Sequence, residues 1–198
     1  MSQPVRSVTA FSGTTLIASG PLVRVALACK DALEAAPAAA LSVFDDETAE
    51  PVEVDLRGST EEIAGRYAQG AETGAPTVTV DGRRAPGRPK LGVVGREVTL
   101  LPRHWEWLNA QPGGASVALR KLVEQARRES ADADAIRASQ NAAFRFTSAM
   151  AGNEIGYEEA VRALYAADAE RFEQCTGSWP ADVRAYSLKL AAAALRRG

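Results

Sequence analysis

The 198-residue sequence has few of the residues that most often carry chemistry. It contains one histidine and two cysteines, Cys29 and Cys175, which lie far apart and belong to no Cys-x-x-Cys pair. This scarcity excludes a zinc site built from cysteine and histidine. Aromatic residues make up only 6% of the chain, whereas alanine is abundant and favours closely packed helices. The two thiols are predicted to be free and buried, as expected in a reducing cytoplasm.

Long apolar runs and nucleotide-binding patterns are also missing from the sequence. No segment is long and apolar enough to span a membrane, and the N-terminal MSQPVRSVTAF lacks the apolar core of a secretory signal. The glycine-rich stretches match neither GxxxxGK[ST] nor GxGxxG. We therefore expect a cytoplasmic protein that has no membrane partner and no cofactor.

The candidates for a catalytic or metal site have weak support. His104 is the only histidine, and no serine or cysteine nucleophile lies near it in the sequence, so a place on the surface of a helix is expected instead. The acidic residues near the middle of the first half fit no calcium-loop spacing. These residues are Asp45, Asp46, Glu47 and Asp55, and an acidic hairpin tip is expected. We predict no catalytic residue, no metal ligand and no enzymatic activity.

The first 80 residues are predicted to form a small α+β domain. Two short β-like runs meet at the Ser12-Gly13 turn, and a helical pattern extends from Gly20-Pro21 to Pro37. After two further strand-like runs, Ser59 is placed to cap a short helix. The expected order is ββαββα, with helices over one face of the sheet. The strand-like runs are VTAF, TTLIAS, LSVF and PVEVDL, and PTVTV (76–80) is a further candidate strand.

Residues 131–198 are predicted to be an all-helical segment. Its first helix has one buried stripe with spacings of three and four residues. Gly152-Asn153 is expected to end that helix, and apolar spacing predicts two short helices after it. Pro180 is expected to begin the last helix. The stripe consists of Ile136, Ser139, Ala143, Phe146 and Met150.

Positive charge is concentrated between these two parts. The chain has a net charge of −2, yet residues 81–103 contain six basic and two acidic residues, which leaves −6 for the rest. Residues 81–95 are predicted to be a basic linker. Its centre, Gly87-Arg88-Pro89-Lys90, resembles the centre of the AT-hook, which lays arginine along a narrow A·T minor groove. Pro86 stands where the full hook has an arginine, and a solvated linker is the alternative. The resemblance implies DNA contacts by Arg83, Arg84, Arg88 and Lys90.

Residues 96–130 contain a β-like run, a proline, a helix of about two turns, a Gly113-Gly114 turn and a longer helix with Ser116 as its cap. This order resembles the ribbon-helix-helix fold of Arc-type repressors. In that fold, strands from two chains pair into a ribbon that enters the major groove. The resemblance implies an obligate homodimer. Its core is expected to contain Leu101, Trp105, Leu108, Leu119, Leu122 and Val123.

The expected strand can lie in two registers, because side chains alternate between its faces. If Leu101 faces the core, Arg96 is the one outer side chain that can bond to a base edge. In the other register, Val98 and Leu100 lie inside and Thr99 faces outward. We favour the second register because it buries no carboxylate. Since either register offers few polar groups to a groove, we expect phosphate contacts and little base discrimination.

Across nearly its whole length the chain resembles a family of uncharacterised bacterial proteins. The resemblance rests on TAFSG, IASGPL, FDD, DLRGS, GRPKLGVVGREVTLLPRHWEWL, AAFRFTSAMAG and WPADVR. It implies no established activity. The leading hypothesis is therefore a homodimeric DNA-binding protein, either a transcriptional regulator or a low-specificity DNA binder. The alternative is a dimeric interaction or scaffold protein that does not bind nucleic acid.

Overall fold

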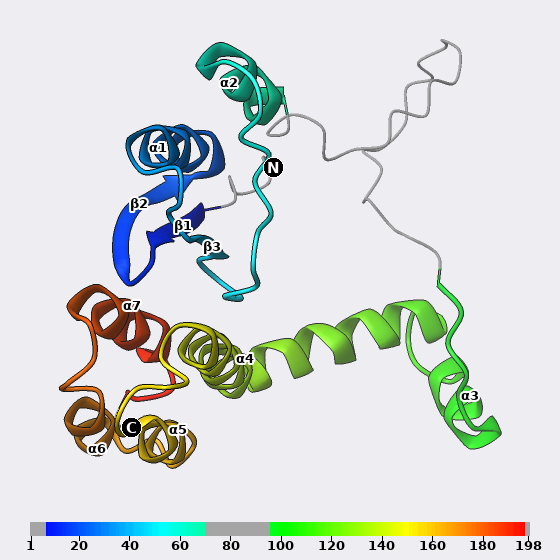
Figure 1. Cartoon of the computed structure of the whole chain (residues 1–198). Helices are drawn as coiled ribbons and strands as arrows, with labels where there is room; N and C mark the ends of the chain where they lie inside the picture. The colour runs from blue at the N-terminus through cyan, green and yellow to red at the C-terminus, as the bar shows by residue number, and fades with distance from the viewer. Residues whose placement is uncertain (1–6, 70–95, 197–198) are drawn as a thin grey trace, which may run out of the picture. The chain divides into compact units, whose positions relative to one another are not determined.

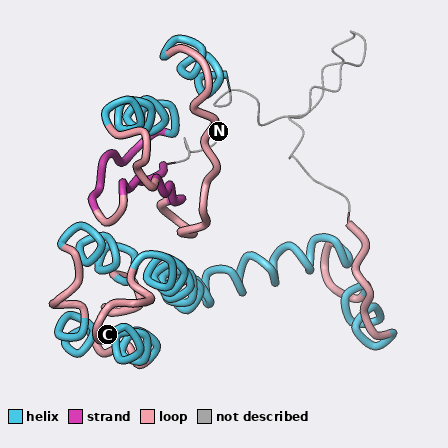
Figure 2. The backbone as a smooth tube through the Cα atoms, viewed as in Figure 1, coloured by secondary structure: helices cyan, strands magenta, loops and turns pink. Residues whose placement is uncertain are grey.

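The protein is a mixed α+β chain, as the sequence predicts. The computed structural model describes residues 7–69 and 96–196. One small antiparallel sheet lies near the N-terminus and helices follow it (Figure 1), so that every described strand precedes residue 46 (Figure 2). The chain divides into two compact units. Unit 1 comprises 1–75 and 132–198, and unit 2 comprises 76–131.

The sheet has three strands, with the first strand in the middle. The strands are β1 (Ser7–Ser12), β2 (Thr15–Pro21) and β3 (Leu41–Asp45), in the order β2-β1-β3. β1 is antiparallel to both of its neighbours. Helix α1 (Leu22–Ala35) connects β2 to β3. It ends shortly before Pro37, as predicted, because proline lacks the N–H that a helix needs.

The two faces of the sheet contribute to two different clusters of buried residues. Side chains alternate along a strand, so one face packs on α1 while Phe11 and Phe44 point to the other side. There they meet Phe146 at ring-centroid distances of 5.4 and 5.1 Å, and Phe146 lies 4.7 Å from Tyr186. Such aromatic pairs each contribute about 0.5–1.5 kcal/mol beyond area burial. The cluster under α1 consists of Val8, Ala10, Val25, Cys29 and Val43.

Six further helices follow β3 in the described residues, and several begin where the sequence predicts. The helix after Ser59 has a reciprocal cap, because Ser59 N–H donates to Glu62 and Glu62 N–H donates to Ser59 Oγ. The last helix begins at Ala181, one residue after the predicted start at Pro180, which is its N-cap. The bounds are α2 (Thr60–Gln69), α3 (Pro102–Asn109), α4 (Gly114–Met150), α5 (Tyr157–Tyr165), α6 (Ala169–Cys175) and α7 (Ala181–Ala191).

The strand predicted at 51–56 is wrong. Only Pro51 makes a β-bridge, to Phe44, and Val52 N–H donates to the Val43 carbonyl at 2.8 Å. The alternating apolar side chains pack instead against the cluster beneath α1. An alternation of apolar and polar side chains with a period of two can therefore arise from this packing alone, without the backbone hydrogen bonds of a strand. The side chains are Val52, Val54 and Leu56.

Two differences concern the segment after residue 95. Residues 96–101 form no strand with any described segment, since a ribbon strand needs a neighbour to complete its ladder. The helix expected to end near residue 130 continues to Met150, because 130–135 contains no glycine or proline that would stop it. The candidate strand at 76–80 and the predicted linker at 81–95 lie outside the described residues.

Candidate functional site

The predicted DNA-contacting residues are only partly described by the structure. Arg96 and Thr99 are exposed in the irregular stretch that precedes α3. No described acidic group forms an ion pair with Arg96. The remaining predicted contacts, Arg83, Arg84, Arg88 and Lys90, lie outside the described residues. The grouping of the six predicted DNA-binding side chains therefore stays a prediction.

The predicted dimer core is mostly exposed in the single chain. Leu108 is buried, with 3% of its surface exposed, and Leu119 is half-buried. The other members are between 37% and 57% exposed. Trp107, which is 52% exposed, is not in the predicted core because it lies off the face of Trp105 and Leu108. We name the exposed set the apolar surface of unit 2. It consists of Val98, Leu101, Trp105, Trp107, Leu122 and Val123.

Local sequence signals determine how α3 and α4 are joined. Pro102 is the first residue of α3, where its missing N–H costs no helical hydrogen bond. The side chain of Gln111 donates to the Trp107 carbonyl at 3.1 Å near the end of that helix. Gly113 and Gly114 then adopt φ values of 87° and 75°, which favour glycine. The sequence therefore specifies the helix pair locally, while its apolar side chains stay exposed.

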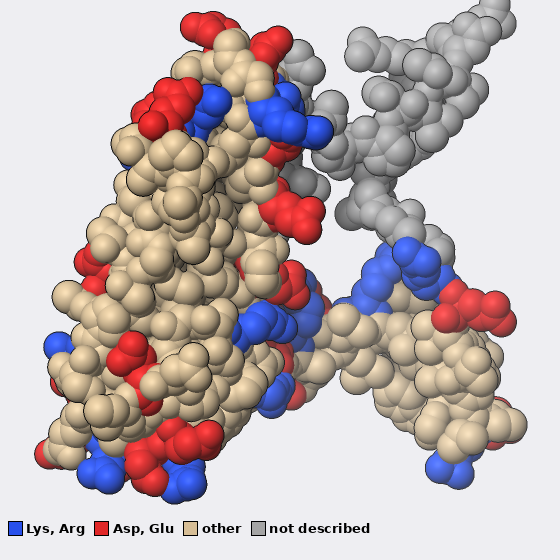
Figure 3. Space-filling view, in the orientation of Figure 1, with Lys and Arg blue, Asp and Glu red and all other residues tan. Residues whose placement is uncertain are grey.

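Basic side chains accompany this apolar surface on α3 and α4. Arg127 and Arg128 pair with Glu124 at 3.2 and 3.6 Å. These pairs are exposed and contribute little to stability, so the two guanidinium groups stay accessible to an anion. Figure 3 shows that most of the visible face of unit 2 is uncharged, with basic and acidic residues at its margins. Arg103, Arg120 and Lys121 are exposed and form no ion pair with a described residue.

A second feature is a nearly buried carboxylate in unit 1. Asp46 directly follows β3, and 16% of its side chain is exposed. Its carboxylate accepts hydrogen bonds from the hydroxyls of Ser7 at 2.7 Å, Thr9 at 2.6 Å and Tyr186 at 2.7 Å. The Lys189 ammonium lies 3.5 Å from the same carboxylate. Asp46 thus links β1 to α7.

The electrostatics of this group follow from its neighbours. Burial raises the pKa of Asp46, but the hydroxyls of Thr9, Ser7 and Tyr186 and the charge of Lys189 together lower it further, so the net pKa is below the ordinary value. Burial and the hydrogen bond to Asp46 raise the pKa of Tyr186. Asp46 is therefore ionised and Tyr186 is a neutral donor near pH 7.

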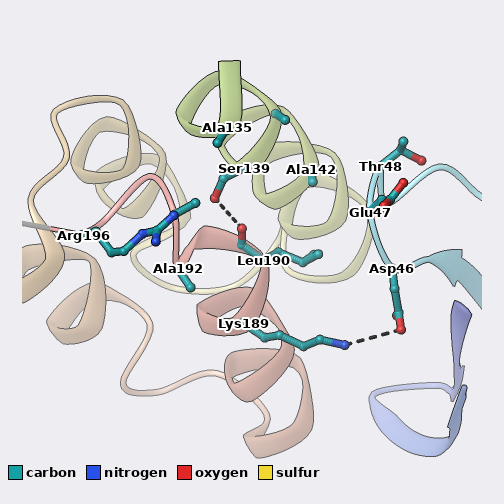
Figure 4. Close-up of a pocket in the computed structure, with 12 residues that line it drawn as sticks. Asp46, Glu47, Thr48, Ala135, Ser139, Ala142, Lys189, Leu190, Ala192 and Arg196 are labelled. Carbon is teal, nitrogen blue, oxygen red and sulfur yellow. Dashed lines mark hydrogen bonds and ion pairs between the residues drawn. The ribbon is translucent and has the colours of Figure 1, made fainter. Parts of the chain in front are cut away.

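An open pocket with a volume of about 700 Å³ lies beside this carboxylate (Figure 4). The turn after β3, the C-terminal half of α4 and the end of α7 line it. Its Ser139 hydroxyl donates to the Leu190 carbonyl at 2.6 Å and accepts from Ala194 N–H at 3.1 Å. Ser139 therefore joins two helices, and its hydroxyl is already satisfied.

Two other features are absent from the described residues. These residues contain no group of three or more His, Cys, Asp or Glu side chains placed to hold a metal ion. In the same residues, no helix has the length and apolar character needed to cross a membrane. Cys29 is a buried free thiol and Cys175 is a half-buried one, and both pack among apolar residues.

These features define a mixed α+β protein with an exposed apolar and basic helix pair in one unit and a nearly buried carboxylate in the other. The family model described as "Uncharacterized protein conserved in bacteria (DUF2239)" matches residues 7–191, and the chain belongs to this family. The resemblance to a bacterial family seen in the sequence is thereby confirmed. Comparison with curated proteins gave no match, and comparison with solved structures gave none.

Proposed function

We propose that the protein is a homodimer that binds DNA with low sequence specificity, and that unit 2 makes both contacts. The observation that carries this proposal is that one unit has both the exposed apolar surface and the positive charge of the chain. Residues 76–131 contain ten Lys or Arg and five Asp or Glu, a net charge of +5, which leaves −7 for the rest. Neither property alone would favour a DNA-binding dimer.

The dimer is supported by the apolar surface of unit 2. Fully burying one large apolar side chain stabilises a protein by about 1.5–3 kcal/mol, and six such side chains are exposed here. Six exposed large apolar side chains within one small unit favour an interaction site. We propose a second copy of the chain as the partner. The order of a helix, a glycine turn and a longer helix after Pro102 resembles the ribbon-helix-helix fold, in which the helices of two chains interlock. Two-fold pairing would use the same surface on both chains.

DNA binding is supported by the charge of the same unit. A dimer would carry the basic groups of two copies, which doubles the charge presented to phosphates. Arg103, Arg120 and Lys121 are exposed and have no acidic partner among the described residues. They could therefore bind phosphate without first breaking an ion pair with one of these residues. In the stretch before α3, Arg96 and Thr99 are the main side chains that could reach into a DNA groove. This scarcity favours phosphate contacts over base recognition.

A gel-shift titration on random duplex DNA tests this proposal. The wild type is compared with the triple variant Arg88→Ala/Lys90→Ala/Arg96→Ala at about 50 and 200 mM salt. We expect binding at low salt, a loss of at least tenfold in affinity at the higher salt because counterions are released on binding, and a further loss in the triple variant.

A matched control removes three exposed positive charges from unit 1, in the variant Arg137→Ala/Arg162→Ala/Arg171→Ala. We expect its affinity for DNA to equal that of the wild type. No binding at low salt, or equal losses in the two triple variants, would contradict the DNA proposal. Absence of binding by a dimeric wild type would favour the alternative, a dimeric scaffold protein without nucleic acid.

A further inference from the structure

We infer that the pocket beside Asp46 in unit 1 binds a short peptide that has free termini and small side chains. The pocket has opposite charges at its two ends and an apolar wall between them (Figure 4). A ligand that fits this pattern is a zwitterion whose charges are separated by an apolar body. This inference concerns a different unit from the proposed DNA contact and is independent of it.

Among the charged groups that line the pocket, one carboxylate and one guanidinium have no charged partner in the described residues. Asp46 and Lys189 lie 3.5 Å apart and neutralise each other, and three hydroxyls already occupy the Asp46 oxygens. Glu47 and Arg196 remain, both exposed and neither paired with a described residue. Figure 4 places these two side chains on opposite sides of the pocket. Glu47 therefore suits a ligand ammonium, and Arg196 suits a ligand carboxylate.

The turn that carries Glu47 is held rigidly before any ligand arrives. Asp45 Oδ1 accepts from Glu47 N–H at 3.0 Å and from Thr48 N–H at 2.9 Å. Ala49 is buried and has a φ of 53°, a left-handed conformation that the surrounding packing must maintain. Because the backbone of the turn is already ordered, a ligand has to fix only the side chain of Glu47.

The size of the pocket distinguishes a peptide from a single amino acid. A cube of about 700 Å³ has an edge of roughly 9 Å, and three extended residues span about 10 Å. A single α-amino acid carries its ammonium and carboxylate groups on the same carbon atom, so it is too short to span this length. Methyl side chains would contact the alanine wall without requiring a deeper side-chain pocket. This wall is formed by Ala135, Ala138, Ala142, Ala192 and Ala193.

Isothermal titration calorimetry of the full chain with trialanine tests the inference. We expect trialanine to bind, and N-acetyl-trialanine and trialanine amide each to bind roughly tenfold more weakly, because each lacks one charge-assisted hydrogen bond. Free alanine is expected to bind more weakly than trialanine. No heat from trialanine at millimolar concentration, or equal affinity for the blocked peptides, would overturn the inference.

Variants assign each end of the ligand to its residue. Glu47→Gln should weaken the binding of trialanine but leave the affinity for N-acetyl-trialanine unchanged. Arg196→Gln should likewise weaken the binding of trialanine but leave the affinity for trialanine amide unchanged. Ala138→Trp should abolish binding by filling the pocket, while the exposed control Arg171→Gln should bind trialanine like the wild type. Thermal unfolding verifies that each variant is folded. Unchanged trialanine affinity in both Glu47→Gln and Arg196→Gln would contradict the assignment.

Discussion

Asp46 joins parts of unit 1 that lie far apart in the sequence. Its carboxylate holds hydroxyls of β1 on one side and Tyr186 of α7 on the other. The pKa of Asp46 is lower in the folded chain than the ordinary value of an aspartate. Its contribution to stability is therefore fully present above the unfolded pKa of about 3.9, and is lost as pH falls through the folded pKa.

Replacing Asp46 by asparagine is expected to destabilise the protein and to flatten its response to acid. Asparagine has no charge to hold Lys189 and one acceptor oxygen in place of two, so we expect a loss of about 1–3 kcal/mol near pH 7. Urea unfolding across a range of pH measures the effect. The difference between wild type and Asp46→Asn should shrink as the pH is lowered below about 4.

The matched control for this experiment is Asp31→Asn, which changes an exposed carboxylate on α1. Its free energy of unfolding should stay within about 0.5 kcal/mol of the wild type. A difference between wild type and Asp46→Asn that is the same at every pH would contradict the assigned role of the ionised carboxylate.

Helix α4 has two halves that are stabilised in different ways. Its C-terminal half packs into the core through Ala143, Phe146 and Thr147. From 121 to 138 almost every side chain is exposed, and ion pairs one turn apart, such as Arg137 with Asp134, provide local support. Such pairs contribute only about 0.2–0.5 kcal/mol each, and a short isolated helix is marginal in water.

Amide hydrogen exchange should therefore differ along this one helix. We expect amides in 124–135 to exchange at least roughly tenfold faster than amides in 140–147, because opening the exposed stretch breaks no tertiary packing. Mass spectrometry of peptides from the exchanged protein resolves the two stretches. Uniform protection along α4 would show that 124–135 is covered in solution and would contradict this expectation.

Ser139 links α4 to the end of α7 by hydrogen bonds, and we expect Ser139→Ala to destabilise the protein by removing them. The substitution leaves the Leu190 carbonyl and the Ala194 N–H without their buried partner, so we expect a loss of about 1–3 kcal/mol in the free energy of unfolding. Ser148→Ala, on the exposed side of the same helix, is the control and should cost less than half as much. Equal effects of the two substitutions in urea unfolding would contradict this role.

The helices were largely predictable because their signals are local. The cap at Ser59 and the start at Pro180 lie within a few residues of the helices that they define. The alternation in 51–56 was misleading, since packing against an apolar cluster satisfies it as well as a strand does. Pairing across long stretches could not be predicted: 140 residues separate Asp46 from Tyr186, and no periodicity connects them.

At the scale of the whole molecule, a small net charge conceals two units of opposite charge. Unit 2 carries +5 and the rest carries −7, so the total of −2 gives no indication that positive charge is concentrated in one unit. Charge placement determines such interactions more than the total does. The sequence located the basic region, but it did not show that most of the expected dimer core is exposed in one chain.

The molar mass in solution tests the central claim, the proposed pairing through unit 2, most directly. Light scattering during size-exclusion chromatography should give about 42 kDa for the wild type at micromolar concentration, twice the 20.9 kDa of one chain. Trp107→Ser/Val123→Ser should return the mass to that of one chain, while Tyr165→Ser, which changes an equally exposed aromatic residue in unit 1, should remain a dimer. A wild type that elutes with the mass of one chain would contradict the claim.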